Sequence, residues 1–152
     1  MRTAAAGAVA AKTLDDLVSQ CNLIVTTTSA KSPLILTDQV QKGTHITAMG
    51  LDDQGKHELE AELLAKADLV VADSVSQCVE HGECFYAVQG KQLDQDSILE
   101  LGQVINNPLI GRTSEDKITV VDLTGVAIQD IQIAKMVDQT LKADKKQMRY
   151  ES

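Results

Sequence analysis

Two neighbouring carboxylates, Asp52 and Asp53, mark the stretch of this chain that is best suited to chemistry. They lie in residues 44–59 (THITAMGLDDQGKHEL), after an apolar run that stops at Gly50 and before a helical pattern that Gly55 opens. Open α/β sheets bind ligands at the carboxyl ends of their strands, so a strand that ends in glycine and is followed by carboxylates is typical of a ligand site. The alternative is that Asp52 only caps the helix, a common role for an aspartate in a loop.

The other expected strands also end in polar residues. Short β-branched runs predict strands at 22–28, 45–49, 68–72 and 118–122, with helical patterns between them. This alternation predicts a three-layer, Rossmann-like α/β fold with a short parallel sheet of about four strands and helices on both faces. Such a sheet brings four polar clusters to one edge, at 26–28, 50–53, 73–74 and 122–125. A binding site is one interpretation of these clusters, and the ordinary polarity of loops is the other.

Helical patterns occupy most of the remaining chain. We predict helices at 4–17, 57–67, 75–86, 97–105 and 126–141. Thr37 is expected to cap one short helical turn that ends at Gly43. The charged residues 143–152 are expected to fray.

Composition narrows the classes of function. The chain has 152 residues, of which 43% are hydrophobic and 2% aromatic, so we expect one domain with an aliphatic core. A net charge of -8 argues against nucleic-acid binding, although a nucleotide cofactor needs only local donors. Three cysteines without metal-ligand spacing favour a reducing cytoplasm, and no apolar run has the length of a membrane span.

The remaining ionisable residues are expected to have structural or surface roles. No pair of histidines has the spacing of metal ligands, so no metal site is predicted. We expect His45 to be packed or hydrogen-bonded within its strand, and His57 and His81 to lie on the surface. The glutamates at 58, 60 and 62 are expected on the solvated face of a helix.

Four segments, in this order, resemble the ornithine cyclodeaminase/mu-crystallin family of NAD(P)-dependent proteins. They are 2–5 (RTAA), the strand and loop 24–29 with 33–35, residues 48–59 (AMGLDDQGKHEL), and 111–113 with 122–130 (DLTGVAIQD). The resemblance covers nearly the whole chain. It implies ancestral NAD(P)-dependent deamination of amino acids or reduction of imines, with a small amino-acid or imine ligand.

The resemblance also implies roles for individual residues. Asp52 corresponds to a catalytic carboxylate that acts as acid or base at the substrate nitrogen and the attacking water. The implied contacts of the NAD or NADP cofactor are Thr28, Gly50, Leu51, Lys56 and Leu123. The implied substrate contacts are Arg2 and Thr124.

Two departures from the family pattern lead to further expectations. No two of the nine glycines have the Gly-x-Gly spacing that holds a pyrophosphate. The family's substrate domain, which supplies a lysine, would precede Arg2. We therefore expect a single partial domain: a remnant of a hinge helix at 2–17, the second half of a cofactor domain at 18–142, and the charged tail.

A partial domain of this kind has consequences for activity and assembly. We expect the chain to be a truncated homologue that does not catalyse the reaction in isolation. Strand 22–28 would then present a bare apolar edge or face, which predicts a homodimer that covers it. The alternatives are a non-enzymatic dimeric binding or assembly module, and a residual enzyme whose cofactor site is rebuilt across a dimer.

Overall fold

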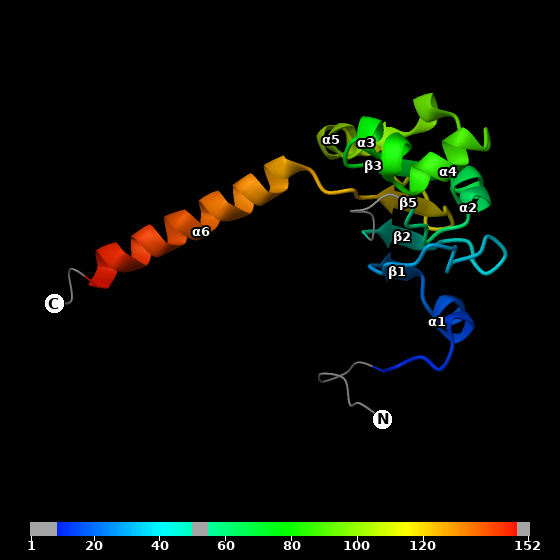
Figure 1. Cartoon of the computed structure of the whole chain (residues 1–152), viewed down its shortest axis with the longest axis horizontal. Coiled ribbons are helices and arrows are strands. Elements are labelled where there is room, and N and C mark those ends of the chain that lie inside the picture. The colour runs from blue at the N-terminus through cyan, green and yellow to red at the C-terminus, as the bar shows by residue number, and fades with distance from the viewer. Residues whose placement is uncertain (1–8, 50–54, 149–152) are drawn as a thin grey trace.

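A five-stranded parallel sheet forms the centre of the domain in a computed structural model, which describes residues 9–49 and 55–148 (Figure 1). The strand order is β1-β2-β5-β3-β4, and every neighbouring pair is parallel. The strands are β1 (Leu23–Thr26), β2 (His45–Ala48), β3 (Leu69–Ala72), β4 (Leu99–Glu100) and β5 (Thr119–Asp122). The predicted α/β class, with a parallel sheet surrounded by helices, is confirmed.

One face of the sheet is buried across four of its five strands. The register aligns Ile24, Ile46, Val120 and Val70 in one row across four strands. All four side chains are buried and belong to one core cluster, together with leucines of the helix after β2. Because side chains alternate along a strand, the neighbouring row faces the other way. In that row Val25 of the edge strand β1 is 55% exposed, and Leu23 on the same face is 63% exposed.

The helices before and between the strands are short. They are α1 (Leu14–Gln20), α2 (Ala61–Lys66), α3 (Val75–His81), α4 (Glu83–Gln89) and α5 (Leu101–Asn106), with 3-10 turns at Gln95–Ser97 and Pro108–Ile110. Isolated helices shorter than about 12–15 residues are marginal in water, so these helices depend on packing. Buried side chains from α2, α3 and α4 join the core cluster.

Three predicted helices begin later or are divided. Residues 9–13 are not helical, because α1 begins only after Thr13, whose side chain accepts a hydrogen bond from the Asp16 amide; residues 4–8 lie outside the described part. Helix α2 begins at Ala61 rather than 57, since Leu59 forms a parallel bridge with Ile35. The predicted helix 75–86 is divided into α3 and α4 at Gly82.

Two further helix predictions are wrong. Residues 37–43 form turns and no helix, with Gly43 at a φ of 83°. In the predicted helix 97–105, Leu99–Glu100 form the edge strand β4 instead, which pairs with Val71 and Ala72. Helix α5 then starts at Leu101, where Glu100 and Gln103 form a capping box. Sequence patterns missed β4 because two residues are too few for a strand period.

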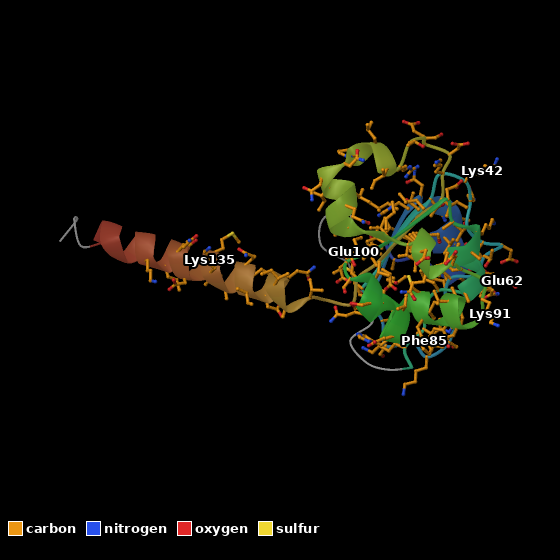
Figure 2. All side chains as sticks on the ribbon, turned by 90° about the horizontal axis from the view of Figure 1, so that it is seen from above. Lys42, Glu62, Phe85, Lys91, Glu100 and Lys135 are labelled. Carbon is orange, nitrogen blue, oxygen red and sulfur yellow. The ribbon has the colours of Figure 1, made fainter. Side chains whose placement is uncertain are left out.

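The last helix, α6 (Ala127–Met148), projects from the body of the domain (Figure 1). Its side chains, Lys135 among them, stand clear of the sheet and its covering helices (Figure 2). It is longer than the predicted 126–141, and it exposes six large apolar side chains, at Ile128, Ile131, Ile133, Met136, Val137 and Leu141. Among the described residues, no helix is long and apolar enough to cross a membrane.

Candidate functional site

The loops after β1, β2 and β5 leave the sheet at one edge and are held there by backbone hydrogen bonds. The last aligned row of the sheet contains Thr26, Ala48 and Asp122. Beyond it, the Met49 amide donates to the Thr26 carbonyl at 2.9 Å, and the Leu123 amide donates to the Ala48 carbonyl at 2.9 Å. Neighbouring strands are about 4.8 Å apart, so the ends of β1 and β5 lie roughly 10 Å from each other. The edge is therefore a continuous platform of three strand ends.

Asp73, which follows β3, holds the loop between β5 and α6. Its Oδ1 accepts hydrogen bonds from the Thr124 amide at 3.2 Å and the Thr124 hydroxyl at 3.1 Å. Its Oδ2 accepts from the Gly125 amide at 2.8 Å, and its own neighbour Ser74 donates an amide to Oδ1 at 2.8 Å. Gly125 has a φ of 80°, a conformation that favours glycine. One carboxylate thus fixes both the backbone and the side chain of Thr124.

A second carboxylate fixes the loop after β1. Glu58 is fully buried, and its Oε1 accepts a hydrogen bond from the Thr28 amide at 2.6 Å. The prediction that Glu58 lies on a solvated helix face is wrong, because α2 begins only at Ala61 and Glu58 is buried in the segment before it, next to the bridge between Ile35 and Leu59. The bond joins the segment after β2 to the segment after β1.

A third carboxylate anchors Glu58 itself. Glu83, at the start of α4, is fully buried, and its two oxygens accept hydrogen bonds from the backbone amides of Glu58, at 2.7 Å, and Leu59, at 3.0 Å. Burial raises the pKa of Glu83 to about 7, and the nearby carboxylates of Asp122 and Glu58 contribute to this rise. Glu83 therefore titrates near neutral pH.

Asp122 ends β5 beneath the same edge. It is fully buried, its Oδ2 accepts a hydrogen bond from the Cys84 amide at 2.9 Å, and burial raises its pKa. Gly82 makes this contact possible, since a Cβ at that position would lie 2.5 Å from Asp122 Oδ2. The thiol of Cys78 donates to the Asp122 carbonyl at 3.4 Å, and burial raises the pKa of Cys78. The Cys78 thiol is therefore not placed to act as a nucleophile.

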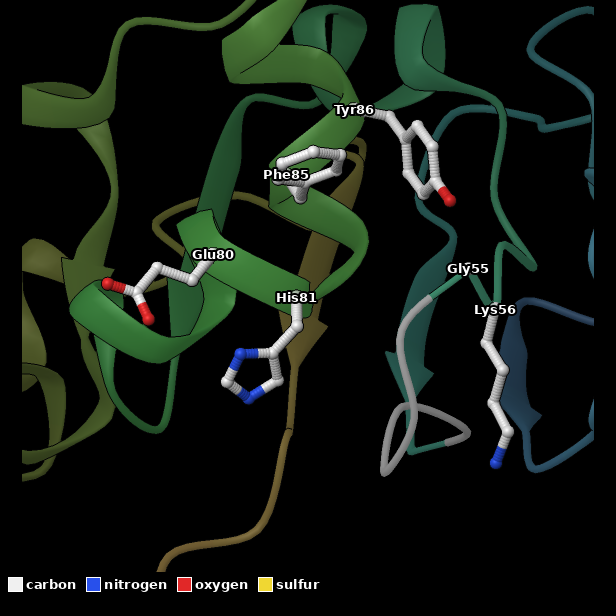
Figure 3. A pocket seen from close by; sticks show the side chains of 6 residues that line it. All are labelled: Gly55, Lys56, Glu80, His81, Phe85 and Tyr86. Carbon is white, nitrogen blue, oxygen red and sulfur yellow. The ribbon is translucent and has the colours of Figure 1, made fainter.

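A cavity of about 350 Å³ adjoins the segment after β2. It is lined by Gly55, Lys56, Glu80, His81, Phe85 and Tyr86. Figure 3 shows Lys56 and His81 on opposite sides of this cavity. The ring of His57 stacks on Tyr86 with centroids 3.8 Å apart, and burial lowers the pKa of His57. The prediction of a surface position for His57 is therefore wrong, because α4 packs over this ring.

The structure describes four of the eight residues to which the resemblance gives a role. Thr28 and Lys56 are linked through the 56–58 segment and the Glu58 bond, and Leu123 and Thr124 lie together after β5. Leu123, Thr124 and Lys56 are half-buried, and Thr28 is exposed. The other four positions lie outside the described residues: Arg2, Gly50, Leu51 and Asp52.

The residues that hold this site were not predicted from the sequence. Asp73 was visible only as one of several polar residues at strand ends, and Glu83 gave no signal within its helical pattern. The prediction for His45 is confirmed, since its Nδ1 lies 2.7 Å from the Thr119 hydroxyl and its Nε2 3.2 Å from that of Thr47. Within residues 9–49 and 55–148, no cluster of three or more His, Cys, Asp or Glu side chains could hold a metal ion.

A parallel sheet with loops anchored at its carboxyl edge defines the class of α/β domains that bind ligands at that edge. Residues 9–145 match the sequence profile of the ornithine cyclodeaminase/mu-crystallin family. The chain belongs to this family, as the four sequence segments indicated.

Several relatives are similar over most of the chain. An uncharacterized cyclodeaminase, y4tK, of Sinorhizobium fredii is 41% identical over 80% of this chain and 37% of its own length. The crystal structure of the iminosuccinate reductase of Paracoccus denitrificans in complex with NAD+ superimposes with a TM-score of 0.81 and 38% identity, over 87% of this chain and 40% of that one. An archaeal alanine dehydrogenase dimer with bound NAD gives a TM-score of 0.76 and 37% identity, over 82% and 39%.

These matches confirm the expected kinship with NAD-binding proteins, and they also show how far along each relative it extends. The chain spans about 40% of the length of the relatives that it matches. The kinship therefore extends to one part of each relative.

Proposed function

We propose that this chain forms the nicotinamide-side part of an NAD(P)-binding domain whose family chemistry is deamination of amino acids or reduction of imines. The observation behind the proposal is the platform of strand ends, on which Thr28, Leu123 and Thr124 are each held by a hydrogen bond that the residue's own backbone amide donates. The NAD complexes of two relatives support the proposal.

The described residues fit one end of such a cofactor. Met49 is 54% exposed and Leu123 half-buried at adjacent strand ends, which gives the platform the apolar surface that an aromatic ring would cover. Lys56 can hold a phosphate or carboxylate by its charge. The pyrophosphate end has no counterpart, since no glycines in the chain have the required spacing. The fit is thus to the nicotinamide half.

The chemistry of the proposed site divides between cofactor and chain. NAD(P), when bound, supplies hydride acceptance or donation at the nicotinamide ring. Thr28 and Leu123 would orient the ring, and Thr124 would contact the substrate. Asp52, whose role rests on the resemblance alone, would hold or release a proton at the substrate nitrogen. We infer that the 152-residue chain in isolation binds cofactor but does not turn over substrate. We also infer a location in a reducing cytoplasm, which suits its three free cysteines.

Calorimetric titration of the 152-residue chain with NADH and NADPH tests the cofactor proposal. We expect saturable binding, weakened several-fold in Lys56→Gln. Lys66→Gln is the matched control, since Lys66 lies on α2 and its Nζ donates to the Thr37 carbonyl at 3.0 Å. No saturable binding up to millimolar cofactor, or equal losses in both variants, would overturn the proposal.

A second candidate is a dimeric binding module, and the bare face of β1 favours it. β1 is an edge strand whose Leu23 and Val25 are 63% and 55% exposed. A second copy of the chain is the proposed occupant of this face, by two-fold symmetry. The archaeal relative that forms a dimer supports the assignment. Such a dimer could also rebuild a cofactor groove from two domains.

Light scattering coupled to size-exclusion chromatography tests the dimer. We expect a dimer for the unchanged chain and a monomer for Val25→Lys. Ile105→Lys is the control, because Ile105 is comparably exposed on α5, an element near β4 at the opposite edge of the sheet. A clean monomer at 100 μM (roughly a hundredfold above a micromolar dissociation constant) would remove the dimeric module.

A further inference from the structure

Three buried carboxylates outside the proposed contact residues lie side by side beneath the platform. Glu58, Glu83 and Asp122 come from the segment before α2, from α4 and from β5, and all three are fully buried. In the described part of the chain none of them forms an ion pair. Buried charges without a cation are costly, so each carboxylate is expected to have a hydrogen-bonding task. Two of these tasks form a continuous path.

The path begins at α4. Glu83 offers one oxygen to the Glu58 amide and the other to the Leu59 amide, at 2.7 and 3.0 Å. Because both oxygens accept a hydrogen bond, two consecutive backbone amides at 58–59 are held by one side chain. Leu59 is also fixed from the other side, through its bridge to Ile35.

The path ends at the loop after β1. Clamping the backbone of Glu58 also fixes where its side chain starts, and that side chain accepts the Thr28 amide at 2.6 Å. Thr28 itself is an exposed residue past the end of the strand, and among the described residues its one further hydrogen bond is from the Ala30 amide to its hydroxyl, at 3.1 Å. The amide of an exposed loop residue is thus held by a fully buried carboxylate.

We propose that Glu83 and Glu58 are positioning residues, which act as a two-carboxylate relay from α4 to the Thr28 loop. The relay sets the distance between the loop after β1 and the segment that contains Lys56, the two sides between which the cofactor would bind. This use of the relay rests on the proposed function, whereas the relay itself is a property of the fold.

Substitution of Glu83 by glutamine breaks the relay with little change of shape. A glutamine has one oxygen and one NH2 group, so it can accept from only one of the two amides and presents a donor to the other. Glu60→Gln is the matched control. Glu60 also accepts a backbone amide, but that amide belongs to Thr37, at 2.7 Å, and not to Thr28.

Amide hydrogen exchange, followed residue by residue by NMR, is the direct test. Above pH 7, where the Glu83 carboxylate is ionised, we expect exchange at Thr28, Glu58 and Leu59 in Glu83→Gln to quicken by about ten- to a hundredfold, as loss of a charge-assisted hydrogen bond implies. The core amides of Ile46 and Val120 should quicken less, and Glu60→Gln should leave Thr28 unchanged. Uniform quickening of all amides, or none at Thr28, would overturn the relay.

A second measurement needs no variant. In the unchanged chain the Thr28 amide should exchange far more slowly than an unprotected loop amide, and full-speed exchange there would overturn the relay even if Glu83→Gln failed to fold. NADH titration then separates the two proposals. Local quickening with weaker NADH binding supports both, whereas local quickening in a chain that binds no NADH at all retains the relay and removes the cofactor proposal.

Discussion

Replacing Asp73 by asparagine should loosen the site without harming the sheet. The Asp73 carboxylate accepts hydrogen bonds on Oδ1 from the Ser74 amide and from the amide and hydroxyl of Thr124, with the Cys78 thiol 3.6 Å away, and on Oδ2 from the Gly125 amide. Asparagine can keep the first set on its oxygen, but its NH2 group then faces the Gly125 amide. One charge-assisted bond is lost, at about 2 kcal/mol, and the others lose their charge assistance, at about 1 kcal/mol more. We therefore expect the free energy of unfolding to fall by about 3 kcal/mol.

The same strand offers a matched control at its other end. Asp68 precedes β3, and its Oδ2 accepts the Ile118 amide at 2.8 Å, just before β5. In Asp68→Asn a single oxygen can still accept that amide, so only charge assistance is lost, at about 1 kcal/mol. For a chain of this length, 1 kcal/mol lowers the Tm by about 2–4 °C. The expected shifts are thus about 6–12 °C for Asp73→Asn and about 2–4 °C for Asp68→Asn.

The assay combines thermal unfolding by circular dichroism with NADH titration. Asp73→Asn should weaken NADH binding at least fivefold, because the Gly125 amide loses its acceptor and the bonds that hold Thr124 lose their charge assistance, whereas Asp68→Asn should bind like the unchanged chain. A Tm within 2 °C of the unchanged chain for Asp73→Asn would refute the reasoning about stability. Equal affinity in both variants would refute the reasoning about the site.

Three further outcomes follow from the buried groups. Gly82→Ala should lower the free energy of unfolding by about 3 kcal/mol, because the new Cβ would lie 2.5–2.7 Å from Asp122 Oδ2 and the Cys78 backbone. The control Gly102→Ala, where a Cβ has nothing within 4 Å, should be neutral or slightly stabilising. Urea unfolding measures both. The pKa of Glu83 is raised from 4.5 to about 7, so between these values the folded chain binds more protons than the unfolded one. The contribution of Glu83 protonation to the free energy of unfolding is therefore complete below pH 4.5 and falls by about 3 kcal/mol as the pH rises to 7. Unfolding measured across this range should show that slope flattened in Glu83→Gln, and parallel curves would contradict it. Iodoacetamide at pH 7.5 should modify only Cys21 in the native chain and all three cysteines in the unfolded one, as mass spectrometry would show, because burial raises the pKa of the other two thiols.

The sheet was predictable because its strands obey local rules. Runs such as 23–26 and 69–72 are β-branched and apolar over both faces, and that pattern depends on no distant residue. The two-residue β4 depends entirely on its neighbour Val71, and no local signal announces it. Thr28, Leu123 and Thr124 lie in clusters that the sequence pattern had placed at the sheet edge, but only the family resemblance gave them individual roles. Lys56 was found through the resemblance alone.

The supporting carboxylates were not predictable, for a physical reason. In the sequence Glu58 stands with Glu60 and Glu62, which is the ordinary pattern of a solvated helix. Its burial is decided by the bridge between Ile35 and Leu59, which pulls the segment out of helical conformation and under the Thr28 loop. That bridge joins residues 24 positions apart, so no local window contains its cause.

Short helices explain why buried acids are used in this way. Helices α2 to α5 have six or seven residues each, too few for the helices to fix the loops by their own rigidity. A carboxylate with two acceptor oxygens can bind two or more backbone amides at once, and it does so without needing regular structure around it. Asp73 holds the loop after β5, Glu58 the loop after β1, and Glu83 the segment between them. The geometry of the platform therefore depends on three side chains that touch no proposed ligand. Variants at these positions should change cofactor affinity while every proposed contact residue remains in place.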